Sequence, residues 1–195
     1  MTAGMAADLP TLSFASAEDF EQWLAAQPAD SPGVWLKLAR KRPGVVALDY
    51  PQALDVALCH GWIDGQKAGL DDTHWVQKFT PRRARSRWSK VNREKVAALI
   101  ELGRMRPAGL AEIERAKADG RWDAAYDSPR TAEVPADLAA AIAADPAAAA
   151  FFATLDRTNR YSILHRVHEA KRPETRARRI AGFVTMLAEG RKIYP

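Results

Sequence analysis

The chain has 195 residues, of which 47% are hydrophobic and 27% are charged, a composition ordinary for a soluble globular protein of one domain or two small ones. Its single cysteine, Cys59, excludes an internal disulfide framework, and no apolar run approaches the roughly 18 residues that span a bilayer. The first residues carry neither the basic nor the apolar stretch of a secretion signal. We therefore expect a cytoplasmic protein that is not inserted into a membrane.

Basic side chains are concentrated in two segments of the chain. The net charge is +5, with a pI near 9.5. Between Lys78 and Lys95, eight lysines and arginines stand against one glutamate, which gives this segment a net charge of +7. Between Lys171 and Arg179, five stand against one, a net charge of +4. Such segments are candidate contacts for anionic partners.

The first half of the chain predicts a mixture of helices and strands. Residues 1–9 are expected to form a disordered leader. The expected elements, in order, are a strand at Thr11–Phe14, a helix from Ala17 to about Ala26 with Ser16 as its cap, a strand at Val34–Ala39, a turn at Lys41–Gly44, a short strand at Val45–Leu48, and a helix from Tyr50 that Gly61 ends.

After Gly61 the apolar pattern predicts a hairpin and two more helices. Strands at Ile63–Gly69 and His74–Thr80 would pair across a turn at residues 70–73. A basic linker follows from Pro81, and Ser89 caps the next helix. A further helix begins at Pro107 and ends at Gly120.

The second half has a different character. After Pro129 there is no tryptophan and little strand pattern, and alanine dominates residues 136–150. Helices are expected to begin at Pro146, Thr158 and Pro173. We predict an α+β fold: a domain over residues 10–125 with a small antiparallel sheet and packed helices, followed by an all-helical C-terminal unit over residues 130–195.

Four stretches of the sequence carry a family resemblance. They are ALCHGWIDGQ (Ala57–Gln66), QKFTPRRARSRWSKVN (Gln77–Asn92), GRMRPAGLAEIERAKADGRW (Gly103–Trp122) and AKRPETRARRI (Ala170–Ile180). Together, and in this order over nearly the whole chain after residue 10, they resemble the bacterial YdeI/OmpD-associated family, also called bacteriocin-protection proteins. The resemblance implies a role in stress protection, including bacteriocin tolerance, and supplies no reaction, cofactor or catalytic residue.

A basic, tryptophan-containing face is the first candidate site. Arginine pairs with phosphates in bidentate fashion, and exposed aromatic rings stack on bases. The face would bind nucleic acid, a small anionic ligand or an acidic partner. Its candidate residues are Trp62, Asp64, Gln77, Arg82, Arg85, Trp88 and Lys90. In the alternative interpretation, residues 81–89 are a solvated linker, and Trp75, Phe79 and Trp88 belong to the core.

Other candidates rest on fewer residues. Asp64, beside Trp62, could line a small-molecule pocket of an enzyme or ligand sensor, or could bond to the backbone or to an arginine. Cys59 and His60 are adjacent and therefore point about 100° apart on a helix, which favours a buried, inert thiol over a nucleophile with its base. His165 and His168 share a helix face but have no third ligand in the pattern, which favours a packing role over a metal site.

The sequence contains no Gly-rich phosphate loop, GxSxG elbow, paired metal motif or Rossmann fingerprint. This argues against an ATP-, NAD- or zinc-dependent enzyme. We expect a stress-protection protein that acts by binding, without a catalytic residue, a metal or a cofactor. The alternatives are a small-molecule enzyme or sensor with a pocket around Asp64 and Trp62, and a module that binds a protein partner through its C-terminal helices.

Overall fold

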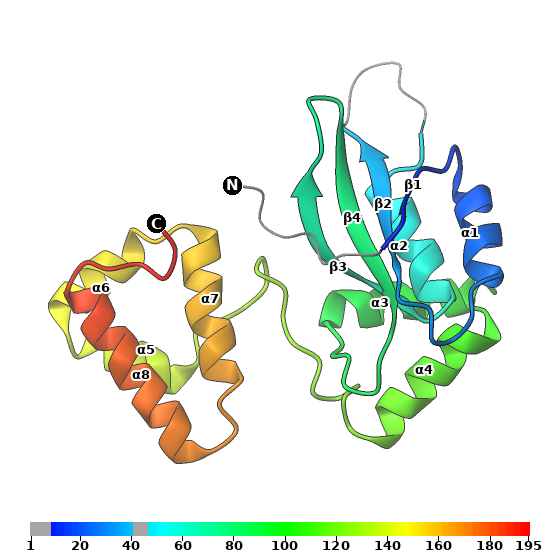
Figure 1. Ribbon diagram of the computed structural model, residues 1–195. Coiled ribbons are helices and arrows are strands. Elements are labelled where there is room, and N and C mark those ends of the chain that lie inside the picture. Colours follow the sequence, from blue (N-terminus) through cyan, green and yellow to red (C-terminus); the bar gives the residue numbers. More distant parts are fainter. Residues whose placement is uncertain (1–8, 41–46) are drawn as a thin grey trace. The chain divides into compact units, whose positions relative to one another are not determined.

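The computed structural model describes residues 9–40 and 47–195, and the chain divides into two compact units, Met1–Tyr126 and Asp127–Pro195 (Figure 1). We call them unit 1 and unit 2 and describe each by itself. The expected leader, apart from residue 9, and the expected turn at Lys41–Gly44 lie outside the described residues. So do the first two residues of the expected strand at Val45–Leu48, whose last two residues are not in a strand.

Unit 1 is built on a four-stranded sheet in the order β1-β2-β4-β3 among the described residues, and its strands are β1 (Thr11–Leu12), β2 (Val34–Ala39), β3 (Trp62–Gly69) and β4 (His74–Pro81). The hairpin of β3 and β4 confirms the prediction from the alternating pattern. β2 pairs with β4 in antiparallel fashion. β1 pairs with β2 in parallel, which was not predicted; the helix between them returns the chain to the same end of the sheet, as a parallel pair requires.

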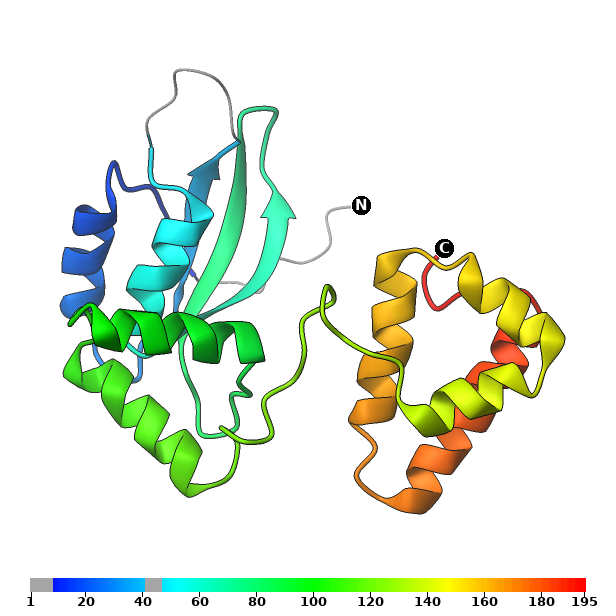
Figure 2. The same ribbon diagram turned by 180° about the vertical axis from the view of Figure 1, so that it is seen from behind.

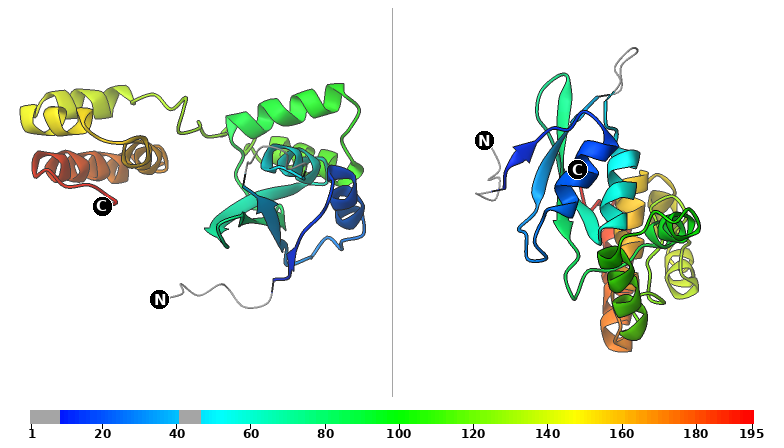
Figure 3. Two further views of the ribbon diagram at one scale, coloured as in Figure 1. Left: turned by 90° about the horizontal axis from the view of Figure 1, so that it is seen from above. Right: turned by 90° about the vertical axis from the view of Figure 1, so that its right-hand side faces the viewer.

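Four helices of unit 1 are described, and they lie on one side of the sheet (Figure 3, left). They are α1 (Ala17–Ala25), α2 (Tyr50–Cys59), α3 (Lys90–Glu101) and α4 (Pro107–Ala118). α2 is the central one, because it contacts α1, β3, α3 and α4 (Figure 2). The predicted caps are observed: Ser16 and Ser89 accept bonds from the first turns of α1 and α3, and Gly61, at φ 76°, follows the end of α2.

The core of unit 1 fills the space between the sheet and α1 and α2. Phe20 of α1 and Phe79 of β4 are fully buried, with ring centroids 5.7 Å apart. α4 lies unusually close to the end of α2, because the N–H of Arg106 donates to the Cys59 carbonyl at 3.0 Å. A Cβ atom on Gly109 would lie 2.2 Å from that same carbonyl oxygen, so only glycine fits this contact.

Unit 2 is all-helical, as predicted, with α5 (Ala136–Ala143), α6 (Pro146–Ala153), α7 (Arg157–His168) and α8 (Pro173–Ala188). Asp145 and Asp156 cap α6 and α7, so α7 begins one residue before the expected Thr158. Leu138, Ile163 and Leu187 are fully buried in its core. Arg176 of α8 binds both carboxylate oxygens of Asp137 and thereby ties the last helix to α5.

Within residues 9–40 and 47–195, no single helix is long and apolar enough to cross a membrane. The pair α5 and α6, bent by 117° at their junction, reaches that length and apolar character only when the two are taken together.

Candidate functional site

Gln77 and Trp62, two of the residues expected on the basic face, have structural roles in unit 1. The side chain of Gln77 is buried, and its Nε2 donates to the carbonyls of Gly65 and Gln66 at 2.9 and 3.1 Å. These carbonyls belong to the irregularity where the pairing of β3 with β4 shifts register. Trp62 is buried against Trp23, with ring centroids 5.7 Å apart. Neither side chain is placed to contact a ligand at the surface.

Asp64 has a partner that neither interpretation of the sequence predicted. Its carboxylate accepts a hydrogen bond of 2.8 Å from the hydroxyl of Tyr50, at the start of α2. Burial, followed by the negative charge of Asp64, raises the pKa of the Tyr50 hydroxyl well above its ordinary value. The pair therefore joins β3 to α2 with a neutral tyrosine as donor. It also fixes the Tyr50 ring, which contacts Trp75.

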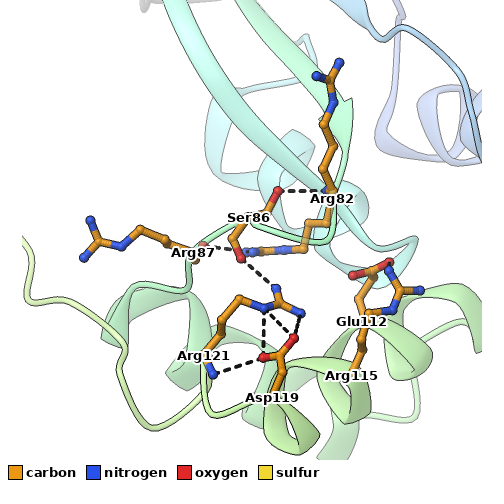
Figure 4. A network of polar contacts seen from close by, with 8 residues as sticks. Arg82, Ser86, Arg87, Glu112, Arg115, Asp119 and Arg121 are labelled. Atoms are coloured by element: carbon orange, nitrogen blue, oxygen red, sulfur yellow. Dashed lines mark hydrogen bonds and ion pairs between the residues drawn. The ribbon is translucent and has the colours of Figure 1, made fainter.

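Arg82 is the most unexpected of the candidate residues, because it lies in the core with only 4% of its surface exposed. Its guanidinium carbon lies over the ring of Trp88, 3.6 Å from the centroid. Its Nη1 donates to the carbonyl of Arg87 at 3.0 Å (Figure 4). Burial lowers the pKa of Arg82 to about 10, so the group is still charged at neutral pH. We call Arg82 and Trp88 together the buried anchor.

The buried anchor closes the loop from Pro81 to Ser89 on itself. Arg82 at the start of the loop binds Arg87 near its end, and the N–H of Arg83 donates to the hydroxyl of Ser86 at 2.8 Å. Arg121, which also pairs with Asp119, donates to the carbonyl of Ser86 (Figure 4). The loop is therefore a defined structure. Phe79 and Trp88 are buried, as one interpretation of the sequence predicted, and Arg83 and Arg85 of the loop are exposed.

The closed loop leaves part of the basic segment at the surface. Arg83, Arg85 and Lys90 are exposed. Arg93, on the first turn of α3, lies over the ring of Trp122 at 5.0 Å and donates to its carbonyl. Beside it is a shallow cavity of about 430 Å³ lined by Lys90, Arg93, Glu94, Ala97 and Trp122. We call Arg83, Arg85, Lys90 and Arg93 the basic surface.

The seven predicted site residues therefore do not share one surface. Arg85 and Lys90 belong to the basic surface. Trp62, Gln77, Arg82 and Trp88 are buried, and Asp64 is bonded to Tyr50. Burial of an arginine is uncommon, and the charge pattern along the chain contains no signal for it. The position of Trp122, which is 29 residues from Arg93, was likewise not predicted.

A cavity that the sequence did not predict lies between α1 and the start of α4. Its volume is about 670 Å³, and it is lined by Glu18, Glu21, Gln22, Ala25, His60, Arg106, Pro107 and Ala108. Glu21 accepts two bonds from Arg106, at 2.6 and 2.9 Å, and lies 3.5 Å from Nε2 of His60. Glu21 and Arg106 are 85 residues apart in the chain, so no local pattern could have joined them.

The pKa values of two groups in this cavity, His60 and Glu21, are both lowered, but for different reasons. Burial lowers the pKa of His60, whose side chain is 9% exposed, because a charged imidazole loses hydration there. Hydrogen bonding to Arg106 lowers the pKa of Glu21. At neutral pH the cavity therefore contains an uncharged His60 beside an ion pair.

We expect the stability of unit 1 to fall as the pH drops below about 6.5, because the unfolded chain protonates His60 near its ordinary pKa of 6.5 while the folded chain resists protonation. The loss of stability starts when the pH falls below the pKa of His60 in the unfolded chain. It stops once the pH is below the pKa of His60 in the folded chain. Thermal unfolding measured across this range should show a smaller pH slope for His60→Gln than for the unchanged protein. Glu21 does not interfere, since its pKa is below 4.5. Equal slopes would contradict this assignment.

The remaining candidate residues, Cys59 and His165, are packed against other parts of the protein. Cys59 is buried, as predicted, and burial raises the pKa of its thiol. His165 lies against the ring of Tyr161 at 5.7 Å. Among the described residues, no group of three or more His, Cys, Asp and Glu side chains is placed to hold a metal ion. The binding of a protein partner by the C-terminal helices stays a prediction.

Comparison with known families divides the chain much as the two units do. Residues 12–112, just over half of the chain, match the model of a family described as Domain of unknown function (DUF8412). Residues 131–190 match the model of the family described as Bacteriocin-protection, YdeI or OmpD-Associated. No curated protein and no solved structure matches the chain.

The match to the bacteriocin-protection family covers fewer residues than the resemblance predicted, which extended over nearly the whole chain after residue 10. Of the four stretches that suggested it, Ala170–Ile180 lies within residues 131–190, while the other three lie wholly or partly within residues 12–112. The chain thus belongs to the DUF8412 family, and residues 131–190 of unit 2 match the model of the bacteriocin-protection, YdeI or OmpD-associated family.

Proposed function

We propose that the protein acts by binding nucleic acid, through the phosphate groups that the basic surface of unit 1 would contact. In the cell this binding would take place in the cytoplasm and serve protection against bacteriocins and related stress, the role suggested by the description of the family that unit 2 matches. The observation that carries the proposal is the buried anchor, which turns an irregular basic loop into a preformed surface.

Preformation matters because ordering a loop on binding costs free energy. An arginine loop that is already closed loses less conformational entropy when a ligand binds than a flexible linker of the same charge. Arg82 supports this arrangement without touching the ligand. Its stacking on Trp88 and its bond to the Arg87 carbonyl keep Arg83 and Arg85 outside the core.

The chemistry of the surface favours phosphate groups. Arginine side chains offer forked donors that match phosphate oxygens, and lysine adds a point charge. Of the residues that line the shallow cavity beside Arg93, one, Glu94, is acidic. The guanidinium of Arg93, which lies over the ring of Trp122, would add a planar cation at this cavity for a phosphate or a base.

Neutralising the basic surface is expected to weaken binding of a labelled single-stranded oligonucleotide at least tenfold at low salt. The variant is Arg83→Gln, Arg85→Gln, Lys90→Gln, and fluorescence anisotropy measures its affinity. Binding of the variant would neutralise fewer phosphates and therefore release fewer counterions. The slope of log Kd against log salt should fall by about 2.

A matched control removes the same charge elsewhere. Arg130, Arg157 and Lys192 are exposed residues of unit 2, and changing all three to glutamine lowers the net charge equally. This control should alter the affinity by less than about threefold. If both variants weaken binding alike, the attraction is a property of total charge and not of this surface. If the unchanged protein does not bind, the proposal fails.

A further inference from the structure

Another cavity of unit 1, of about 510 Å³, lies at the other end of β4 and has no role in the proposed nucleic-acid binding. It is lined by Arg40, Lys67, Ala68, Gly69 and Trp75. Trp75 is the second residue of β4, whereas the basic loop follows its last residue, Pro81. At the rise of an extended strand the two places are about 20 Å apart. The cavity is therefore a separate place on the molecule.

Trp75 is held as a fixed platform beside this cavity. Its ring contacts the ring of Tyr50, with centroids 5.9 Å apart and planes inclined at 49°. Tyr50 is itself fixed by the 2.8 Å bond from its hydroxyl to Asp64. Part of the Trp75 side chain is buried against the core, and part reaches the cavity. Because Tyr50 and the packing against the core set its orientation, a ligand that stacks on it would not have to order the ring.

Gly69 leaves room over Trp75. The two residues are paired directly across β3 and β4, so a side chain at position 69 would point to the same face of the sheet as the indole ring. The nearest atom that a Cβ on Gly69 would meet is Nη2 of Arg40, at 3.8 Å. Because position 69 has no side chain, space remains between the indole and the Arg40 guanidinium.

The polar groups that line this space are cationic. Arg40 is placed by a bond from its Nε to the carbonyl of Asp71, and Lys67 lies two residues before Gly69 on the same face of β3. The nearby carboxylate of Asp71 is engaged within its own turn, where it accepts from the N–H groups of Thr73 and His74. The cavity thus combines an aromatic platform with two positive charges.

We propose that this cavity binds a planar aromatic molecule that carries a phosphate or carboxylate group, with the ring on Trp75 and the anion between Arg40 and Lys67. Its volume falls within the range of roughly 300–1,000 Å³ usual for small-molecule sites, which suits a nucleoside monophosphate. The stacking partner supplies affinity for the ring, and the guanidinium offers forked donors to the anion.

The test is calorimetric titration of the full-length protein at low salt with four probes: adenosine 5′-monophosphate, indole-3-acetate, adenosine and inorganic phosphate. We expect the first or second to bind and the last two, which have only a ring or only an anion, to bind at least tenfold more weakly. Binding by the nucleotide or by the aromatic carboxylate identifies which anion the site takes. Equal binding of adenosine or phosphate alone, or no binding of either aromatic anion, would overturn the proposal.

A steric variant separates this site from a general effect of charge. Gly69→Val keeps Trp75 and both cations but fills the space above the ring, and its extended backbone suits valine. It should retain the thermal stability of the unchanged protein and lose at least tenfold in affinity. The matched control is Ala98→Val, an exposed position on α3 that does not line the cavity. If Gly69→Val binds as the unchanged protein does, the cavity is not the site.

Because these variants leave the basic surface intact, their effect on the oligonucleotide separates the two proposals. Gly69→Val should bind the oligonucleotide normally, and the triple glutamine variant of the basic surface should bind the nucleotide normally. If the protein fails to bind the oligonucleotide, the nucleotide titration still tests the cavity. If it fails to bind the nucleotide, the anisotropy measurement still tests the basic surface.

Discussion

Replacing Gly109 by alanine is expected to destabilise unit 1 by about 3 kcal/mol, the upper part of the range for overpacking. The same substitution in a helix ordinarily stabilises by up to about 1 kcal/mol. The sign reverses here because the added methyl group would lie 2.2 Å from the carbonyl oxygen of Cys59 and 2.8 Å from Cε of Met105. A backbone oxygen cannot move aside, so α4 would have to shift away from α2.

Urea unfolding followed by tryptophan fluorescence measures this effect on unit 1 selectively, since all six tryptophans lie within it. The control is Gly182→Ala in α8, where a Cβ atom would meet nothing within 4 Å. That variant should stabilise unit 2, measured by far-ultraviolet circular dichroism, by about 0.5–1 kcal/mol. A neutral Gly109→Ala would mean that the contact between α2 and α4 is looser than described.

Replacing Trp88 by alanine should cost about 3–5 kcal/mol of the stability of unit 1, the usual range for a buried tryptophan. The side chain is 2% exposed and contacts Trp122 as well as Arg82. Its removal leaves a cavity and withdraws the aromatic face from a guanidinium that has little access to water. Because Arg82 closes the basic loop, oligonucleotide binding should weaken too, although Trp88 is buried.

Arg85→Ala is the control for this prediction, because it changes an exposed residue of the same loop. It should change stability by less than about 0.5 kcal/mol while still weakening binding. Unfolding in urea and anisotropy, measured on both variants, separate the two effects. A Trp88→Ala protein as stable as Arg85→Ala would contradict the description of the buried anchor.

Much of the fold could be predicted because its signals are local. The alternation of β3 and β4, the caps at Ser16 and Ser89 and the left-handed Gly61 are each legible within a few residues, and the α+β class follows from them. The parallel pairing of β1 was missed because two residues carry too little pattern to define a partner.

The site was harder to predict because burial is decided by contacts between distant segments. The sequence shows Arg82 as one of several similar arginines, and its difference from Arg83 depends on where Trp88 and Glu112 lie in space. Glu21 in the middle of α1 comes together with His60 at the end of α2 and Arg106 at the start of α4. The pairing of Gly69 with Trp75 follows from the hairpin register, whereas the cavity above it needs Arg40, which directly follows β2.

The stacking of Arg82 on Trp88 also bears on how this sequence can change over time. The two side chains are buried against each other, so a substitution at either position alone leaves the other side chain without its packing partner. A viable replacement would have to alter both positions together, for example to two apolar side chains of matched volume. Substitutions at positions 82 and 88 should therefore occur together in related sequences. The fold does not couple Arg83 and Arg85, which face solvent, to either position.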